Sequence, residues 1–236
     1  MNYAWNWSVL VQQPYLGWLL EGLWTTVWIS LAAWIIALLA GSLLGVTGSL
    51  PGRIRLLTPA YVAVFRNVPL LLQLFLWFFV VPELLPPAAG NWLKRGLPHP
   101  EWWTAVVGIG LFTAARVAVQ IRAGIRAVAA GQLAAALASG MRLRQAYRFV
   151  LLPQALRLVL PPLTSEFLTV FKNSALALTI GVFEMTAQSR QIENYTFNGF
   201  EAFTAATAVY LAIALTVTFC MRALERRLAI PGTRSV

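Results

Sequence analysis

Long apolar runs, separated by short polar or proline-containing segments, dominate the pattern of this chain. A helix that crosses the roughly 30 Å hydrocarbon core of a bilayer needs about 20 predominantly apolar residues, and five runs reach that length. We therefore predict an all-α integral membrane protein, in which residues 1–236 form one transmembrane domain of five spanning helices. The predicted spans are residues 23–47, 58–81, 102–121, 161–183 and 202–221.

The residues at the ends of these runs support the predicted boundaries. Trp24 and Trp28 lie near the start of the first run, where indole rings favour the membrane interface. Pro82 and Pro86 follow the second run, and proline disfavours the continuation of a helix. Residues 1–17 lack the positively charged start of a signal peptide, so we expect the first span to be retained.

The composition agrees with a membrane protein. The chain is 59% hydrophobic and 11% charged, with a mean hydropathy of +0.70, which is far from the values of a soluble domain. The net charge of +10 raises the alternative of nucleic-acid binding, but the basic residues lie in blocks between the apolar runs. That distribution favours membrane topology. Cys220 is the only cysteine and lies within an apolar run, so we expect a buried, inert thiol.

The blocks of basic residues predict the orientation of the chain. The loops after the first and third spans and the C-terminal tail are strongly basic, whereas Glu residues offset the few basic residues of the other two loops. Because basic loops remain in the cytoplasm, we expect the N-terminus outside and the C-terminus inside. The basic set is Arg53, Arg55, Arg122, Arg126, Arg142, Arg144, Arg148, Arg157, Arg222, Arg226, Arg227 and Arg234; the offset set is Lys94 and Arg95 with Glu83 and Glu101, and Arg190 with Glu184, Glu193 and Glu201.

The longest basic loop, residues 129–157 between the third and fourth spans, reads as a folded connector on the cytoplasmic side. Gly131–Ser139 is rich in Ala and Leu, which are strong helix formers, and Gly140 suits a left-handed position at a helix end. Met141–Leu151 restarts as a second short helix before Pro153. We predict two short helices joined at a fixed elbow. The alternative is that Gly140 only ends a helix and that the arginines bind anionic lipid head groups.

The spacing of this connector resembles the coupling loop of ABC importer permeases, whose pattern is E-A-A, three residues, G, nine residues, I, one residue, L-P. The Gly and Leu-Pro positions match in register, but Ala replaces the leading Glu. The resemblance implies that the connector plugs into a groove on a separate ATPase subunit. The matching residues and their neighbours, which it implies for ATPase coupling, are Ala134, Ala135, Ala136, Ser139, Gly140, Met141, Leu152 and Pro153, with Val150 at the Ile position.

Other segments narrow the resemblance. Gly22–Thr26 and Phe65–Leu71 are similar to the polar amino acid uptake branch of these permeases, and Phe112–Val117 with Lys172–Ala175 is similar to its glutamate/aspartate members. The resemblance implies a type I importer fold in the bacterial inner membrane. It also implies two ATPase subunits that hold ATP and magnesium, a second permease subunit that is either identical or a paralogue, and an external amino acid binding protein. The chain itself has no phosphate-binding loop motif, so we expect no cofactor in it.

Ionisable residues within the predicted spans are candidates for the substrate pathway, because charges at membrane depth usually face a cavity or a partner. Arg116 and Lys172 fall near the middle of their spans, and an Arg fork matches a carboxylate. One hypothesis is that Arg116, with Lys172 and Asn173, attracts an acidic amino acid. The alternative is that Arg116 pairs with Glu166, which lies at a similar depth. Arg66, near the cytoplasmic end of the second span, fits snorkelling, helix packing or gating better than ligand binding.

Two other functional classes compete with this interpretation. A self-contained channel or an ion-coupled carrier for a small anionic solute would transport without a partner, but the chain lacks the internal repeat common in such carriers. A membrane-embedded enzyme would need a nucleophile, a metal cluster or an acid/base pair. His99 reads as a solvated loop residue, and Glu184, Glu193 and Glu201 read as surface groups that contact an external binding protein.

Overall fold

The computed structural model describes residue 3 and residues 5–50, 52–128 and 130–228. Within those ranges every regular element is helical and no strand occurs, which confirms the prediction of an all-α protein. Arg234 of the predicted basic tail and residue 129, the first of the predicted connector, lie outside the described residues. The elements in chain order are η1 (Trp7–Val11), α1 (Tyr15–Thr47), η2 (Arg53–Leu56), α2 (Leu57–Asn67), α3 (Leu70–Phe75), η3 (Leu76–Val80), α4 (Val81–Leu84), α5 (Pro87–Asn91), η4 (Trp92–Gly96), α6 (Pro100–Ala127), α7 (Ala130–Ala138), α8 (Leu143–Ala146), η5 (Tyr147–Leu151), α9 (Leu152–Ser174), η6 (Ala175–Ile180), α10 (Met185–Thr196) and α11 (Gly199–Leu228).

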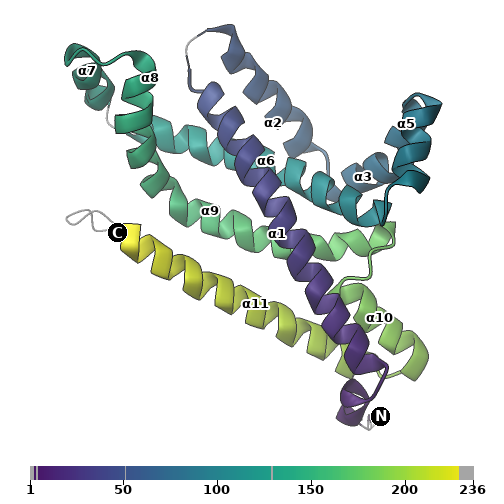
Figure 1. Cartoon of the computed structure of the whole chain (residues 1–236). Coiled ribbons are helices and arrows are strands. Elements are labelled where there is room, and N and C mark those ends of the chain that lie inside the picture. The colour runs from purple at the N-terminus through teal and green to yellow at the C-terminus, as the bar shows by residue number, and fades with distance from the viewer. Residues whose placement is uncertain (1–2, 4, 51, 129, 229–236) are drawn as a thin grey trace. The chain divides into compact units, whose positions relative to one another are not determined.

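The chain divides into two compact units, each built from three separate segments. Unit 1 contains residues 1–35, 68–110 and 169–216, and unit 2 contains residues 36–67, 111–168 and 217–236. The chain therefore passes from one unit to the other five times. Four of these passages occur within the long helices α1, α6, α9 and α11, which Figure 1 shows, and one occurs between α2 and α3.

Three of the helices described are long and apolar enough to cross a membrane. They are the helices at Tyr15–Thr47, Pro100–Ala127 and Gly199–Arg227, and they contain the first, third and fifth predicted spans. The number rises to five if two bent helix pairs each count as one span. These pairs cover the second and fourth predicted spans, so the two runs that contain internal prolines are the ones that form irregular helices.

The second predicted span is not a continuous helix. Helix α2 ends at Asn67 and α3 begins at Leu70, with Pro69 at the junction in an extended conformation (ψ 136°). A residue before proline is pushed away from helical backbone angles, so the chain breaks at Val68, directly after the polar residues Arg66 and Asn67. After the break, helical structure continues through Pro82 as far as Leu84, beyond the predicted end of the span.

The fourth predicted span is part of a longer helical segment. Helical structure runs without a gap from Leu143 to Ile180, and Gly181 ends it with a φ of +91°. Pro161 and Pro162 lie inside α9, where each removes one backbone hydrogen bond without ending the helix. The predicted fourth span, residues 161–183, therefore begins inside this longer helical segment.

In unit 2 the segment of α6 is packed between neighbouring helices. On α1, Gly41 lies against Val117 and Gly45 lies against Ile121, so small residues let the two helices approach closely. Helix α2 is tied to α6 by the hydroxyl of Tyr61, which donates a 2.7 Å hydrogen bond to the backbone carbonyl of Leu111. These contacts fix the position of the part of α6 that carries the candidate pathway residue.

In unit 1 the first helix packs against α10. Gly22 lies against Met185 and Gln188, and the backbone N–H of Met185 donates a 3.0 Å hydrogen bond to the hydroxyl of Thr26. Ile29 and Ile192 are fully buried in this unit. The same helix α1 therefore contributes to the core of both units.

Large apolar side chains cover the outer faces of α1 and α11. Leu39 and Leu43 on α1, and Leu215 and Phe219 on α11, are each at least 62% exposed on this chain. Exposed apolar surface of this extent is typical of contact with lipid or with another membrane subunit. Cys220, which lies on α11, is exposed, so the prediction of a buried thiol is wrong.

Candidate functional site

The predicted elbow at Gly140 is a regular helix C-terminus. The N–H of Met141 donates to the carbonyl of Ala136 at 3.1 Å, and the N–H of Gly140 donates to the carbonyl of Leu137 at 3.0 Å. Together with the φ of +84° at Gly140, this pattern is a Schellman motif, which ends α7 in a defined conformation. The prediction of a left-handed glycine at this position is confirmed. The connection is therefore rigid at its turning point.

The next helix begins at once after the elbow. The backbone N–H of Arg142 donates a 2.8 Å hydrogen bond to Oε1 of Gln145, and the N–H of Gln145 donates to the carbonyl of Arg142 at 2.9 Å. This reciprocal pair satisfies backbone groups that would be left without partners at a helix start. With α7 ended and α8 started by local hydrogen bonds, the elbow needs no contact from elsewhere to hold its shape.

The tip of the elbow projects from the helices on either side. Met141 is 36% exposed and Leu137 is 43% exposed, and both are apolar. Ala136 is buried, and it anchors the inner side of α7. The remaining residues predicted for coupling in this region are exposed, namely Ala134, Ala135, Ser139 and Gly140. The structure thus brings these residues together on one small, mostly apolar projection.

The second half of the predicted connector differs from the expectation. Instead of a short helix that ends near Leu151, the chain continues from α8 through the π-helical turn η5 into α9. The π turn directly precedes Leu152 and Pro153 and changes the hydrogen-bond register there, so this proline does not end the helix. The elbow is therefore joined to a long helix and not to a flexible segment.

The helix after the elbow contacts two other helices of unit 2. The hydroxyl of Tyr147 donates a 2.9 Å hydrogen bond to the backbone carbonyl of Ser49, just after the end of α1. Further along, Gly124 of α6 lies so close to α9 that a Cβ atom there would be 2.2 Å from Cγ1 of Val159. The helix after the elbow is thus in direct contact with α6 and with the residues that follow α1.

Arg116 and Glu166, two residues predicted for the substrate pathway, form an ion pair in unit 2. Nε of Arg116 on α6 donates a 2.6 Å hydrogen bond to Oε2 of Glu166 on α9. The Glu166 side chain is 9% exposed and the Arg116 side chain is 40% exposed. The predicted alternative of an Arg116–Glu166 pair is therefore formed. Because this hydrogen bond uses only Nε, the two terminal nitrogens of the guanidinium group remain as donors for a ligand.

The other three pathway candidates form no comparable ion pair with any residue that the structure describes. Lys172 is exposed and Asn173 is half-buried near the end of α9 in unit 1, and Arg66 is exposed at the end of α2 in unit 2. Their place relative to the Arg116–Glu166 pair stays a prediction. His99 has an exposed side chain, as expected, and its Nδ1 lies 3.5 Å from Oε1 of Glu101.

Two of the three glutamates predicted as surface groups are fully buried. Glu184 caps α10, because its carboxylate accepts hydrogen bonds of 2.9 Å from the N–H groups of Thr186 and Ala187 and one of 2.7 Å from the hydroxyl of Tyr210. Glu201 accepts hydrogen bonds from the hydroxyl of Tyr3 at 2.5 Å and from the N–H of Asn6 at 2.6 Å.

For Glu184 and Glu201 the prediction of surface groups is wrong. Both carboxylates are held by neutral donors, so they stabilise the fold of unit 1 and are not free to contact a partner. The sequence carried little signal for Glu184, since the residues that commonly cap a helix start are Ser, Thr, Asp and Asn.

Sequence reasoning also missed a contact between α9 and α11. The hydroxyl of Thr164, two residues before Glu166, donates a 2.7 Å hydrogen bond to Oε1 of Glu225 near the C-terminal end of α11. Thr164 is buried. Nothing in the local sequence pairs residues 61 positions apart, so only the packing of the helices reveals the contact.

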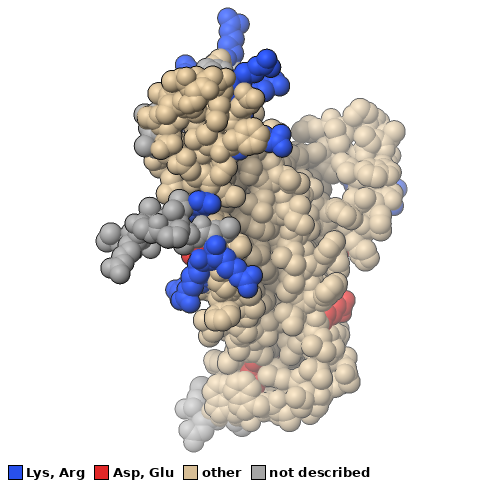
Figure 2. All heavy atoms as spheres, turned by 60° about the vertical axis from the view of Figure 1, so that its left-hand side comes forward, with Lys and Arg blue, Asp and Glu red and all other residues tan. Residues whose placement is uncertain are grey.

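The charge of the two units differs strongly. Of the Lys and Arg residues that the structure describes, thirteen belong to unit 2 and four to unit 1. Of the Glu residues, two belong to unit 2 and six to unit 1. Figure 2 shows most of the visible Lys and Arg side chains gathered together, with few acidic atoms among them. The elbow thus belongs to the strongly basic unit.

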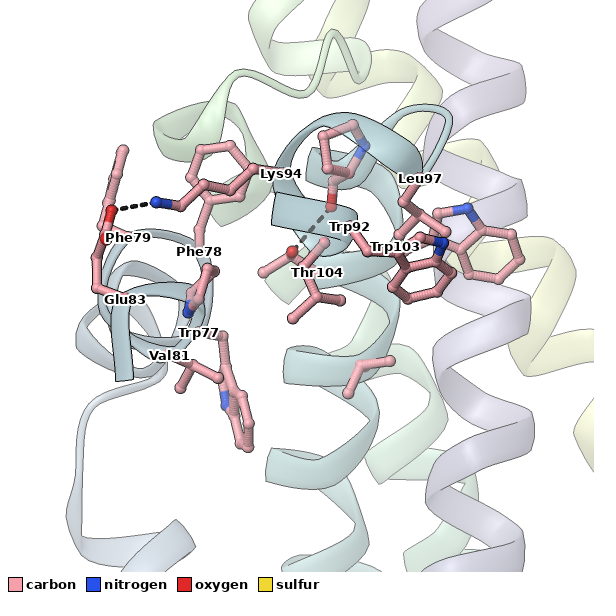
Figure 3. Close-up of a pocket in the computed structure, with 14 residues that line it drawn as sticks. Trp77, Phe78, Phe79, Val81, Glu83, Trp92, Lys94, Leu97, Trp103 and Thr104 are labelled. Atoms are coloured by element: carbon pink, nitrogen blue, oxygen red, sulfur yellow. Dashed lines mark hydrogen bonds and ion pairs between the residues drawn. The ribbon is translucent and has the colours of Figure 1, made fainter. Parts of the chain in front are cut away.

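Unit 1 contains a cavity of about 570 Å³ between the segment of η3 to η4 and the start of α6. Figure 3 shows its aromatic lining, which includes Trp77, Trp92 and Trp103. The Lys94 ammonium group points to the carboxylate of Glu83, and the two form an ion pair. Since that charge is already paired and the rest of the lining is mainly apolar, the cavity is poorly suited to an acidic amino acid.

The comparisons with known proteins agree with one another. Residues 36–230 match the family described as "Binding-protein-dependent transport system inner membrane component". The glutamate/aspartate import permease protein GltJ of Escherichia coli (strains K12 and O6:H1) is 44% identical, over 98% of each chain. The glutamate/aspartate import permease protein GltK of Escherichia coli O6:H1 is 33% identical, over 96% of this chain and 100% of the relative.

Solved structures share the fold. A crystal structure of an amino acid ABC transporter with histidines has a chain that is 30% identical and superimposes with a TM-score of 0.80, over 95% of this chain and all of the other. An inward-facing MetNI methionine ABC transporter, 19% identical, gives a TM-score of 0.77 over 93% of this chain. The helices described above therefore form the fold of an ABC type I importer permease.

Proposed function

This chain belongs to the family of binding-protein-dependent transport system inner membrane components, and we propose that it imports glutamate and aspartate as part of an ATP-driven complex. It is a multi-pass amino acid permease of the ABC transporters and a transport subunit, not an enzyme. The partner that hydrolyses ATP, the solute that is carried and the residues that act on either belong to the proposal.

One observation carries the proposed coupling to an ATPase. The elbow at Gly140 is rigid through its own hydrogen bonds, exposes an apolar tip, and is continuous with the helix that carries Glu166. A rigid projection of this kind transmits force when it is held in a groove on a moving partner. In this chain Ala134 stands where the family pattern has Glu, so docking rests on shape and on apolar contact at Leu137 and Met141.

The charge of the units supports the proposed orientation. Unit 2 is strongly basic, and basic segments remain on the cytoplasmic side of the inner membrane. Five predicted spans, an odd number, put the two ends of the chain on opposite sides of the membrane. We therefore place the N-terminus outside, the C-terminus in the cytoplasm and the elbow on the side where ATP is available.

The substrate assignment rests on the relatives and on Arg116. GltJ, at 44% identity, is named as a glutamate/aspartate import permease. The guanidinium group of Arg116 is held at Nε by Glu166, which leaves its terminal nitrogens to meet a carboxylate of an acidic amino acid. The two hypotheses from the sequence are thus compatible, because Glu166 orients the same group that contacts the solute.

A second, related permease subunit is the proposed partner within the membrane. GltJ and GltK of Escherichia coli O6:H1 are both named as glutamate/aspartate import permeases, and both are similar to this chain over nearly its full length. That relationship favours pairing with a paralogue over pairing with an identical copy. An external binding protein delivers the amino acid, as the name of the family states for its transport systems.

In this mechanism two ATPase subunits close when they bind ATP and magnesium, and the elbows of the two permeases move with them. The movement passes from α8 and η5 to α9 and, through the contacts at Ser49 and Gly124, to α1 and α6. The helices that carry Arg116 and Glu166 then alternate between an outward and an inward opening. ATP provides the bias because it has different affinities for the two states.

The proposal is tested by purification and reconstitution. A tagged chain is purified from its native membrane and the associated subunits are identified, and the complex is then placed in liposomes with the external binding protein. We expect an ATPase and a second permease to co-purify, and glutamate uptake to require ATP. Uptake by the isolated chain without nucleotide would instead support a self-contained channel or carrier.

A further inference from the structure

A hollow of about 310 Å³ lies in unit 2 between the end of α1 and the helix that follows the elbow. Its apolar walls come from Val46 and Leu50 on one side and from Leu143 and Leu152 on the other. The hydroxyl of Tyr147 binds the carbonyl of Ser49 and so holds the two sides together. The hollow is therefore a fixed feature of this unit.

Two arginines line this hollow, and neither forms an ion pair with an acidic residue that the structure describes. Arg144 and Arg148 line it and are four residues apart, a spacing that places side chains on one face of a helix. The acidic residues that the structure describes in unit 2 are Glu166 and Glu225, which are held by Arg116 and Thr164. Both arginines are exposed, and the guanidinium group of Arg148 lies 5.5 Å from the ring of Phe149. Two unpaired cations beside apolar walls attract an anion that carries an apolar part.

The position of the hollow along α1 indicates where such an anion comes from. Val46 lies in the last turn of α1, which is long and apolar enough to span a membrane, and Leu50 lies just beyond its end. One turn earlier, Leu43 is 66% exposed and faces outward as a lipid-contacting residue would. The predicted first span, residues 23–47, ends in this turn, so we place the turn at the level where acyl chains meet head groups. An ion that reaches this level with an apolar tail is a phospholipid.

We propose that this hollow binds one anionic phospholipid, whose phosphate lies on the guanidinium groups of Arg144 and Arg148 and whose first acyl methylenes lie against Val46 and Leu50. The volume is at the lower end of the range of about 300–1,000 Å³ for ligand sites, so it holds the head-group region and not a whole lipid. A bound lipid joins the end of α1 to the helix after the elbow, and so stiffens the connection that Tyr147 makes.

The experiment is native mass spectrometry of the full-length chain in detergent, titrated with phosphatidylglycerol and, separately, with zwitterionic phosphatidylcholine. The wild-type chain is expected to retain one phosphatidylglycerol in preference to phosphatidylcholine. The R144Q/R148Q variant should bind phosphatidylglycerol about 30-fold more weakly, which is the effect of two basic residues at an anionic surface. The L50W variant, which fills the apolar part and keeps both charges, should also lose the bound lipid.

A matched control separates a site from general attraction to charge. Arg222 and Arg226 are exposed, four residues apart on α11 and in the same unit, so R222Q/R226Q removes the same charge elsewhere. This variant should keep the bound phosphatidylglycerol, and neither inorganic phosphate nor glycerol 3-phosphate should displace it. Equal loss in both double variants, equal retention of both lipids, or displacement by free phosphate would overturn the proposal.

The alternative to a lipid at Arg144 and Arg148 is a partner protein. If R144Q/R148Q retained its phosphatidylglycerol and instead lost an ATPase subunit on co-purification, the arginines would belong to a protein interface and the lipid site would be disproved. The proposal does not depend on coupling to ATP. Lipid binding and nucleotide-driven uptake are measured separately, so either one can fail while the other holds.

Discussion

The hydroxyl of Tyr147 donates a 2.9 Å hydrogen bond to the backbone carbonyl of Ser49, and it thereby ties the helix after the elbow to the end of the first long helix. The two residues are 98 positions apart in the chain. Tyr147 itself is buried, with 8% of its surface exposed. In the proposed mechanism this bond is one of the contacts through which movement of the elbow reaches α1.

The Tyr147→Phe variant should keep the fold and lose part of the coupling. Removal of the hydroxyl leaves the carbonyl of Ser49 without this donor, at an expected cost of about 1 kcal/mol in the free energy of unfolding. We expect ATP hydrolysis by the complex to continue while the number of glutamate molecules imported per ATP falls. Tyr15→Phe is the control, since no hydrogen bond joins the Tyr15 hydroxyl to the described residues. An unchanged import ratio would remove Tyr147 from the coupling path.

Variants of the ion pair between Arg116 and Glu166 test whether it acts in transport or only stabilises the fold. Either single variant, Arg116→Gln or Glu166→Gln, should lower stability by about 1–2 kcal/mol, because each leaves a charge without its partner. Both should also reduce glutamate uptake. The exchanged pair R116E/E166R restores the opposite charges, and with them most of the thermal stability.

In the exchanged pair, uptake should remain low, because the guanidinium group is then on α9 and no longer on α6. Thermal melting in detergent and uptake in liposomes are measured on the same preparations. If the exchange restored uptake along with stability, the pair would be a structural contact and Arg116 would not meet the substrate.

Glu184 should matter for stability although it forms no ion pair with a described Lys or Arg. The Glu184→Gln variant replaces an acceptor oxygen by an amide that faces the N–H groups of Thr186 and Ala187 and the hydroxyl of Tyr210. We expect a loss of about 1–3 kcal/mol and a lower melting temperature. Glu21→Gln, the same change at an exposed position of α1, serves as the control and should leave melting unchanged. Similar melting of both variants would contradict the assigned capping role.

Gly140 offers a test of the elbow through its backbone. A φ of +84° strains any residue with a Cβ atom, at a cost of about 1–2 kcal/mol, and β-branched residues tolerate it least. Gly140→Val should therefore change the angle between α7 and α8 and reduce ATP-dependent uptake strongly. Gly140→Asn should retain most uptake, because Asn adopts left-handed angles more readily. Equal uptake by the two variants would show that the conformation of the elbow is unimportant.

The sequence predicted the local features of the fold and of the elbow well. The uninterrupted apolar runs form the long helices α1, α6 and α11. Gly140 has the left-handed conformation that was predicted from its place after a segment rich in Ala and Leu. Such features depend on neighbouring residues only. The pairing of Arg116 with Glu166 was reached as one of two alternatives, because depth along each helix can be counted but rotation about its axis cannot.

Features that depend on tertiary packing were not predictable in the same way. Pro153 read as the limit of a short helix, yet the helix continues through a π turn into α9, which is in contact with α6 and α11. Glu184 and Glu201 read as surface residues, since their partners Tyr210 and Tyr3 are distant in the chain.

The most direct test of the account is a cross-link from the elbow to an ATPase. A photoreactive amino acid is placed at Ala135, which is exposed on α7, and in a control at Leu211, which is 58% exposed on α11. In an assembled, transporting complex, position 135 should form an adduct with the ATPase subunit whose yield changes when ATP is added, and position 211 should not. If position 135 gave no ATPase adduct while the complex remained intact and active, the elbow would not be the coupling contact.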